Sequence, residues 1–204
     1  MYTIIGAGIG GLATALAFEK CGIEYQLFEK YAELQEVGAG IWLAPNALQI
    51  IEWLGILEDI KSSGNSIDQI TLAKADFSAL SDNEQDNMKA KFGYSTIAIH
   101  RAELQRVLAS KIPQEKIHLG KAFQEFEELD NKKVKVTFED QTSIQTDFLI
   151  GADGIHSKVR NQLFPQSKTR YSGQTCWRGI SDFQLNQDYE HRGIESWGNQ
   201  IRFG

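Results

Sequence analysis

The stretch from Tyr2 to Glu29, which decides the fold, reads YTIIGAGIGGLATALAFEKCGIEYQLFE. Residues 2–5 are a short apolar run that breaks into a glycine-rich segment, and an alanine-rich run follows that closes at Cys21-Gly22. This order predicts a strand, a tight turn and a helix with a glycine stop. Residues 23–29 alternate well enough for a second strand. We therefore expect a βαβ unit with two parallel, neighbouring strands.

The glycines of the turn follow the spacing Gly6-x-Gly8-x-x-Gly11. This spacing alone is weak evidence in a chain with 18 glycines. Its place between a strand and a helix assigns the glycines a tight turn, close backbone approach to a pyrophosphate and close helix packing. The helix N-terminus also offers free N–H groups to phosphate oxygens. We predict a dinucleotide site that includes Gly6, Gly8, Ile9, Gly10 and Gly11.

Glu29 ends the second strand, 18 residues after Gly11. An acidic residue at this position can accept hydrogen bonds from both ribose hydroxyls of an adenosine, and it rejects a 2′-phosphate. The dinucleotide is then FAD or NAD rather than NADP. The alternative is an exposed glutamate at a strand end, paired with Lys30. We count Lys30 among the candidate cofactor contacts as well.

Two further helices are expected after this unit. Apolar residues recur at helical spacing from Pro45 to Ile60, with Gly55 as the weak point, and again from Arg101 to Ser110. Residues 78–91 between them are polar, which indicates a mobile surface excursion.

The pattern changes to period two from Ala122 onward. It predicts antiparallel strands at 122–129, 134–138 and 142–146. The wholly apolar residues 148–150 predict a buried central strand that returns to the parallel sheet and delivers a loop. Residues 174–180 and a hairpin at 194–203 then predict the start of a second layer.

Composition and charge exclude several classes. Among 204 residues, 42% are hydrophobic and 24% charged, so the chain should fold. The balance of 21 Lys and Arg against 27 Asp and Glu gives a charge of −6, which makes a nucleic-acid partner unfavourable. Two scattered cysteines and four histidines form neither a disulfide framework nor a zinc spacing. The longest apolar stretch, 41–57, is too polar to cross a membrane. We expect a cytoplasmic protein without metal or transmembrane segment.

Several ordered blocks together resemble one family. The quoted blocks are Gly6 to Gly11 with Glu29, VGAGIWLAPNALQIIEWLGI at 37–56, IHRAELQRVL at 99–108, DFLIGADGIHSKVR at 147–160 and YSGQTCWRGI at 171–180. They are similar to single-component FAD-dependent aromatic hydroxylases, the group A flavoprotein monooxygenases. The branch resembles salicylate- and 3-hydroxybenzoate-hydroxylase-like and zeaxanthin-epoxidase-like proteins.

The resemblance implies an α/β fold with a glutathione-reductase-type, Rossmann-like FAD-binding domain. That domain would cover residues 1–168, with surface excursions at about 61–98. Residues 169–204 would begin an antiparallel β substrate domain. The family's second flavin motif, a Gly-Asp followed by Ala-x-His and a proline, does not occur in this sequence. We therefore expect an N-terminal portion of a longer protein.

The resemblance also implies roles for single residues. Asp153 and Gly154, the Asp-Gly motif, would contact sugar hydroxyls on the flavin side and help to receive the nicotinamide cofactor, and Arg160 would support their loop. Arg101 would reach the pyrophosphate or the ribityl chain. A helix cap or a surface salt bridge is the alternative for Arg101.

Three more residues are implied near the flavin. Gly38 and Gly40 would let the backbone pass close to it. Arg178 is a candidate for contact with the substrate or the flavin edge, against the alternative of simple strand packing.

The activity implied by the resemblance is that of an NAD(P)H-dependent flavoprotein monooxygenase. It would use O2 to hydroxylate or epoxidise a small aromatic or conjugated substrate, with NAD(P)H as a transient co-substrate and with no catalytic side chain required. Two alternatives stay open: a flavin-dependent reductase or dehydrogenase on the same fold, and a cofactor-binding fragment without turnover. The substrate, NADH or NADPH as reductant, and the oligomeric state are not predicted.

Overall fold

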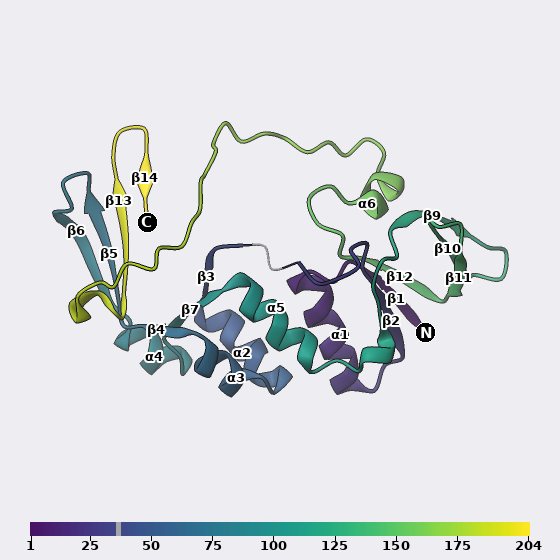
Figure 1. Ribbon diagram of the computed structural model, residues 1–204, viewed down its shortest axis with the longest axis horizontal. Coiled ribbons are helices and arrows are strands. Elements are labelled where there is room, and N and C mark those ends of the chain that lie inside the picture. Colours follow the sequence, from purple (N-terminus) through teal and green to yellow (C-terminus); the bar gives the residue numbers. More distant parts are fainter. Residues whose placement is uncertain (36–37) are drawn as a thin grey trace. The chain divides into compact units, whose positions relative to one another are not determined.

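The structure, a computed structural model, describes residues 1–35 and 38–204, and the chain divides into two units. The first unit comprises Met1–Val37 and Leu104–Trp177, and the second comprises Gly38–Glu103 and Arg178–Gly204. The colours of Figure 1 follow the chain from the first unit into the second, back to the first, and again into the second. Each unit is described by itself below.

The first unit contains a parallel sheet in the order β12-β1-β2-β8. Its strands are β1 (Tyr2–Ile5), β2 (Tyr25–Phe28), β8 (Ile117–His118) and β12 (Phe148–Gly151). Helix α1 (Ile9–Cys21) connects β1 to β2 and ends where Gly22 adopts the left-handed conformation. The predicted βαβ unit with parallel neighbouring strands is therefore confirmed (Figure 1).

Strand β12 returns to the parallel sheet as predicted, but it is neither central nor fully buried. It pairs with β1 on one side and lies at the edge of the described sheet. Phe148 at its start is 55% exposed. An apolar run is typical of a strand that is buried on both faces of a parallel sheet. Whether such a strand is central depends on a neighbouring strand at each of its two edges, which the run itself does not indicate.

A second, antiparallel sheet packs against the first within this unit. It consists of β9 (Phe123–Glu128), β10 (Val134–Phe138) and β11 (Ser143–Thr146), close to the predicted strands. Ile5 and Phe28 at the ends of two parallel strands share one buried cluster with the antiparallel strands and α6 (Lys158–Leu163). The other members are Phe123, Val136, Phe138 and Val159. This core holds the carboxyl ends of β1 and β2 in place.

The second unit contains a small antiparallel sheet, and the helices α2 (Pro45–Leu54) and α3 (Leu57–Ser63) follow its first strand. The sheet has the order β3-β7-β4, with β3 (Gly40–Leu43), β7 (Thr96–His100) and β4 (Asn65–Ile67). The single helix predicted from Pro45 to Ile60 is wrong: α2 and α3 are separate. Gly55 has a φ of 82°, a left-handed conformation that ends α2 and that glycine adopts without strain.

A mixed sheet completes the second unit, in the order β14-β13-β5-β6. Its strands are β5 (Gln69–Lys74), β6 (Ala79–Glu84), β13 (Arg192–Trp197) and β14 (Arg202–Phe203). The predicted hairpin of β13 and β14 is confirmed. The polar residues 78–91 are not a plain loop, because they form β6 and α4 (Asp86–Phe92). The strand β6 is polar and exposed, and its backbone pairs with β5.

The remaining elements are α5 (Arg101–Ser110), η1 (Gln114–Lys116) and η2 (Gln187–Tyr189). Helix α5 has the predicted bounds. The strand predicted at 174–180 is absent: residues 167–186 form no helix or strand, and Trp177 is 91% exposed. A strand pattern without a neighbouring strand leaves its backbone groups unpaired. Among the described residues, no helix combines the length and apolarity needed to cross a membrane.

Candidate dinucleotide-binding site

Two glycines of the turn are required by packing. Gly6 has a φ of 103°, and a Cβ there would lie 2.5 Å from the carbonyl oxygen of Ala152. A Cβ on Gly11 would lie 1.8 Å from the carbonyl oxygen of Gly6. Both distances are far below any real contact. These glycines therefore bring the end of β1, the start of α1 and the loop after β12 together.

The other two glycines face open space. A Cβ on Gly8 or Gly10 would meet no atom within 4 Å. Gly8 is the N-cap of the 13-residue helix α1, with no side-chain cap and no acidic residue in the first turn. The partial positive charge of the helix end is thus available to an anion from outside. This arrangement fits a pyrophosphate.

Glu29 is bonded to the same turn. Its Oε2 accepts a hydrogen bond from the Ala7 N–H at 2.7 Å, and its Oε1 accepts one from the Tyr31 N–H at 3.1 Å. A carboxylate can accept about four hydrogen bonds, so capacity is left for ribose hydroxyls. The Lys30 ammonium lies 4.7 Å from the centre of the Tyr31 ring. The side chain of Glu29 thus bonds the backbone of the turn, unlike a solvent-exposed glutamate at a strand end.

Gln105 bonds to the glycine turn, a contact that the sequence did not predict. Its Nε2 donates a hydrogen bond to the Ala7 carbonyl at 2.8 Å, and its side chain is buried. It stands on α5 among the buried residues Leu104, Val107 and Leu108. The sequence does contain a signal for this contact: Gln105 is a polar residue within an apolar helix face. A buried side-chain amide requires a hydrogen-bond partner.

The Asp-Gly loop that follows β12 is fixed by its own side chains. Asp153 accepts hydrogen bonds from Ser157 Oγ at 2.5 Å and from the Lys158 N–H at 2.7 Å. Ser157 in turn caps α6 by accepting from the Arg160 N–H. The Arg160 guanidinium donates to the Ile155 carbonyl at 2.6 Å, so this arginine does support the loop. Gly154 has a φ of 82°.

Near the C-terminal end of α1, an ionic group fixes the helix to β2 and η1. Glu19 accepts hydrogen bonds from Tyr25 Oη at 2.8 Å and Lys116 Nζ at 2.5 Å. The bond from Lys116 lowers the pKa of Glu19. Burial, followed by the bond to Glu19, raises the pKa of Tyr25. Cys21, the last residue of α1, is exposed.

The second unit contains the other predicted cofactor residues. Gly38 has a φ of 144°, and a Cβ there would lie 2.8 Å from Arg101 Cβ. His100 Nδ1 accepts from the Ala102 N–H, so Nε2 carries the proton and donates to the Gly38 carbonyl at 3.0 Å. Gly40 begins β3 with open space at its Cβ position. Val37, the first residue of this block, lies outside the described residues.

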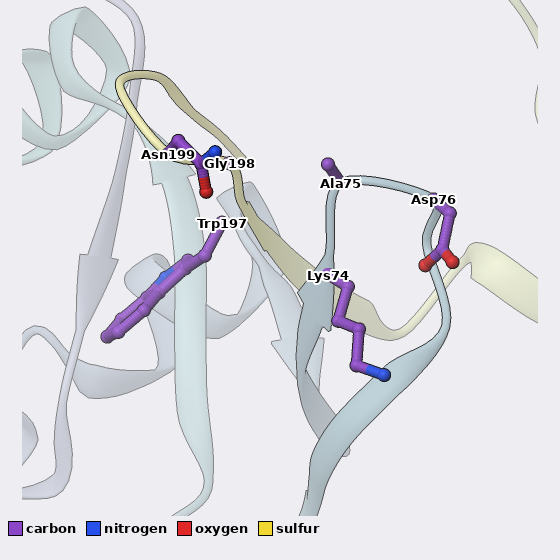
Figure 2. Close-up of a pocket in the computed structure, with 6 residues that line it drawn as sticks. All are labelled: Lys74, Ala75, Asp76, Trp197, Gly198 and Asn199. Carbon is purple, nitrogen blue, oxygen red and sulfur yellow. The ribbon is translucent and has the colours of Figure 1, made fainter.

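Arg178 lies in the exposed segment without helix or strand. The second unit also contains an open hollow, which Figure 2 shows. It lies where β5 connects to β6 and β13 connects to β14. Its lining residues are Lys74, Ala75, Asp76, Trp197, Gly198 and Asn199. The Arg202 guanidinium lies 4.2 Å from the centre of the Trp197 ring. None of the predicted site residues lines this hollow.

Comparison with known families gives a match to the FAD binding domain over residues 2–184. The chain belongs to this family of FAD-binding domains. FAD is accordingly its cofactor, and the α/β, Rossmann-like fold predicted from the sequence is confirmed. The open space at Gly8 and Gly10, and the acceptor capacity of Glu29, fit this dinucleotide.

Relatives of the FAD-binding chain include monooxygenases. It is 34% identical to aurachin C monooxygenase/isomerase of Stigmatella aurantiaca, over 98% of this chain and 52% of that protein. It is 36% identical to the chloroplastic zeaxanthin epoxidase of Solanum lycopersicum, over 88% of this chain and 28% of that protein. The resemblance seen in the sequence is thereby confirmed.

One similar solved structure is that of Klebsiella pneumoniae HpxO complexed with FAD and uric acid. It aligns with a TM-score of 0.71 and 30% identity, over 79% of this chain and 41% of HpxO. The chain spans about half the length of the first relatives that it matches.

Proposed function

We propose that this chain provides the FAD-binding part of a flavoprotein monooxygenase. The enzyme would use NAD(P)H and O2 to hydroxylate or epoxidise a small aromatic or conjugated substrate. The similarity to a monooxygenase and an epoxidase, over 98% and 88% of the chain, carries this proposal. The open glycine turn with Glu29 beside it supports the cofactor assignment.

The residues of the first unit would bind the cofactor. The N–H groups around Gly8 and Gly10 would receive the pyrophosphate, and Glu29 would hold the adenosine ribose. Asp153 would keep the Asp-Gly loop rigid beside Gly6, where it can contact sugar hydroxyls. When bound, FAD supplies the redox and oxygen chemistry that side chains do not provide.

Three residues of the second unit are also proposed as cofactor or substrate contacts. Arg101, held in place against Gly38, would contact the pyrophosphate or the ribityl chain, and Gly40 would let the backbone approach the flavin. Arg178 would contact the substrate or the flavin edge. In this proposal residues 1–168 form the FAD-binding domain and residues 169–204 begin the substrate-binding β layer.

Oxygen transfer tests the proposal directly. The protein, purified from the cells that produce it, is supplied with NADH or NADPH, ¹⁸O₂ and a panel of hydroxylated aromatic and conjugated compounds. We expect one labelled oxygen atom in a product and consumption of O2 in step with it. Reduction of an added electron acceptor by NAD(P)H, without label in any product, would identify a reductase or dehydrogenase instead.

A further inference from the structure

We propose that Gln105 is a positioning residue for FAD, acting through the peptide group between Ala7 and Gly8. The proposal rests on FAD binding and is independent of the oxygen chemistry. Gln105 does not belong to the glycine motif, to the Asp-Gly motif or to the residues that the sequence predicted. Its role follows from the hydrogen bond that it donates to the Ala7 carbonyl in the glycine turn.

Both polar groups of Ala7 are held by buried or half-buried side chains. Glu29 Oε2 accepts from the Ala7 N–H at 2.7 Å, and Gln105 Nε2 donates to the Ala7 carbonyl at 2.8 Å. The two partners come from different elements, the end of β2 and the helix α5. Two consecutive peptide planes of the turn are thereby fixed.

The second of these planes bears the N–H of Gly8. In a trans peptide the N–H points away from the carbonyl of the same plane, and the described chain has no cis peptide. Holding the Ala7 carbonyl toward Gln105 therefore turns the Gly8 N–H to the opposite side. That N–H has no acceptor among the described residues, and a Cβ on Gly8 would meet open space. It is available to an anion.

Glycine makes such a hold necessary. The peptide between Ala7 and Gly8 borders a residue with little preference in φ, so it can rotate at low cost. A rotated plane would point a carbonyl oxygen at the pyrophosphate and repel it. Gln105, only 7% exposed, holds that plane from a buried position.

The test compares variants at Gln105 by FAD titration of the purified apoprotein. Gln105→Met keeps the length of the side chain without the donor, and Gln105→His restores a donor at a similar place. Ser110→Ala is the matched control, because it removes a hydrogen bond of α5, to the Val107 carbonyl, far along the helix from the turn. Thermal unfolding of each apoprotein reports on stability separately.

We expect the Kd for FAD to rise about tenfold in Gln105→Met, which corresponds to about 1.4 kcal/mol. Gln105→His should recover most of this loss. The ³¹P resonances of bound FAD should shift in Gln105→Met, whereas a merely structural role would lower the unfolding temperature and leave these resonances in place. Ser110→Ala should change neither the Kd nor the resonances.

Two results would overturn the proposal. One is a Kd and ³¹P spectrum of Gln105→Met equal to those of the wild type. The other is equal loss in the Met and His variants, which would mean that packing and not the donor matters. Failure of the wild-type protein to bind FAD would overturn the cofactor assignment together with this proposal, whereas missing oxygen transfer would leave it intact.

Discussion

The glycine turn at residues 6–11 and the segment at 167–186 show opposite relations between pattern and structure. In the turn, the side chains of Glu29, just after β2, and Gln105 of α5 bond the backbone, and glycines fit against neighbouring carbonyls. In the segment, a strand-like pattern finds no strand to pair with, and the side chain of Trp177 is almost wholly in solvent. A local sequence pattern therefore forms a defined turn or strand only where neighbouring elements bond its backbone.

The largest effect should come from a side chain at Gly11. Gly11→Ala places a Cβ 1.8 Å from the Gly6 carbonyl oxygen, so the start of α1 must move. We expect loss of FAD binding and a decrease of about 3 kcal/mol in the free energy of unfolding. Gly10→Ala, into open space on the same helix, is the matched control for stability. Urea unfolding and FAD titration measure both, and similar stability of the two variants would contradict the tight packing.

A smaller effect is expected at Glu29. Glu29→Ala removes the acceptor of the Ala7 N–H and the predicted acceptor of the ribose hydroxyls. Charge-assisted hydrogen bonds contribute about 1.5–3 kcal/mol each, so FAD binding should weaken by a few kcal/mol at most. Glu29→Arg should bind more weakly still. Fluorescence titration with FAD is the measurement, and unchanged affinity in both variants would make Glu29 a mere surface residue.

In the exposed segment at 167–186, replacing a large side chain should leave the free energy of unfolding almost unchanged. Trp177→Ser alters a side chain that is 91% exposed, and we expect the free energy of unfolding to change by less than about 0.5 kcal/mol. Urea denaturation of the 204-residue chain checks this. A decrease well above 1 kcal/mol would show that Trp177 is packed, and the contrast between the two regions would then disappear.

A further small effect concerns pH. The bond from Lys116 lowers the pKa of Glu19, so the folded state holds this proton less tightly than the unfolded state. The resulting stability is present above the unfolded pKa of about 4.3 and is lost as pH falls through the lower folded pKa. The pair is partly exposed, so it contributes less than about 1 kcal/mol. Glu19→Gln should therefore flatten the acid side of the stability profile slightly. An acid profile identical to that of the wild type would contradict the role of this pair.

Much of the fold could be predicted because its signals are local. The strand, glycine turn and helix at 2–21 and the helix at 101–110 need only neighbouring residues to be recognised. The edge position of β12 and the pairing of β6 with β5 depend on which strands lie beside them, which no local pattern contains. Helix α2 ends at Gly55 because that glycine is left-handed, whereas the periodicity runs on.

The site divides in the same way. Gly6, Gly8, Gly11 and Glu29 were predicted from spacing, because the motif lies within one βαβ unit. Gln105 was not, since its partner Ala7 is 98 residues away in the sequence. Gly38, Gly40, Arg101 and Arg178 belong to the second unit, and their contacts with the cofactor remain predictions.

The central claim is that the glycine turn and Glu29 bind the adenosine and pyrophosphate half of FAD. Equilibrium titration of the apoprotein with FAD and with FMN tests it most directly, because FMN has the same flavin but lacks the adenosine half. We predict that FAD binds at least about a hundredfold more tightly than FMN, equivalent to about 2.7 kcal/mol or more. Equal affinity for the two flavins would contradict the claim.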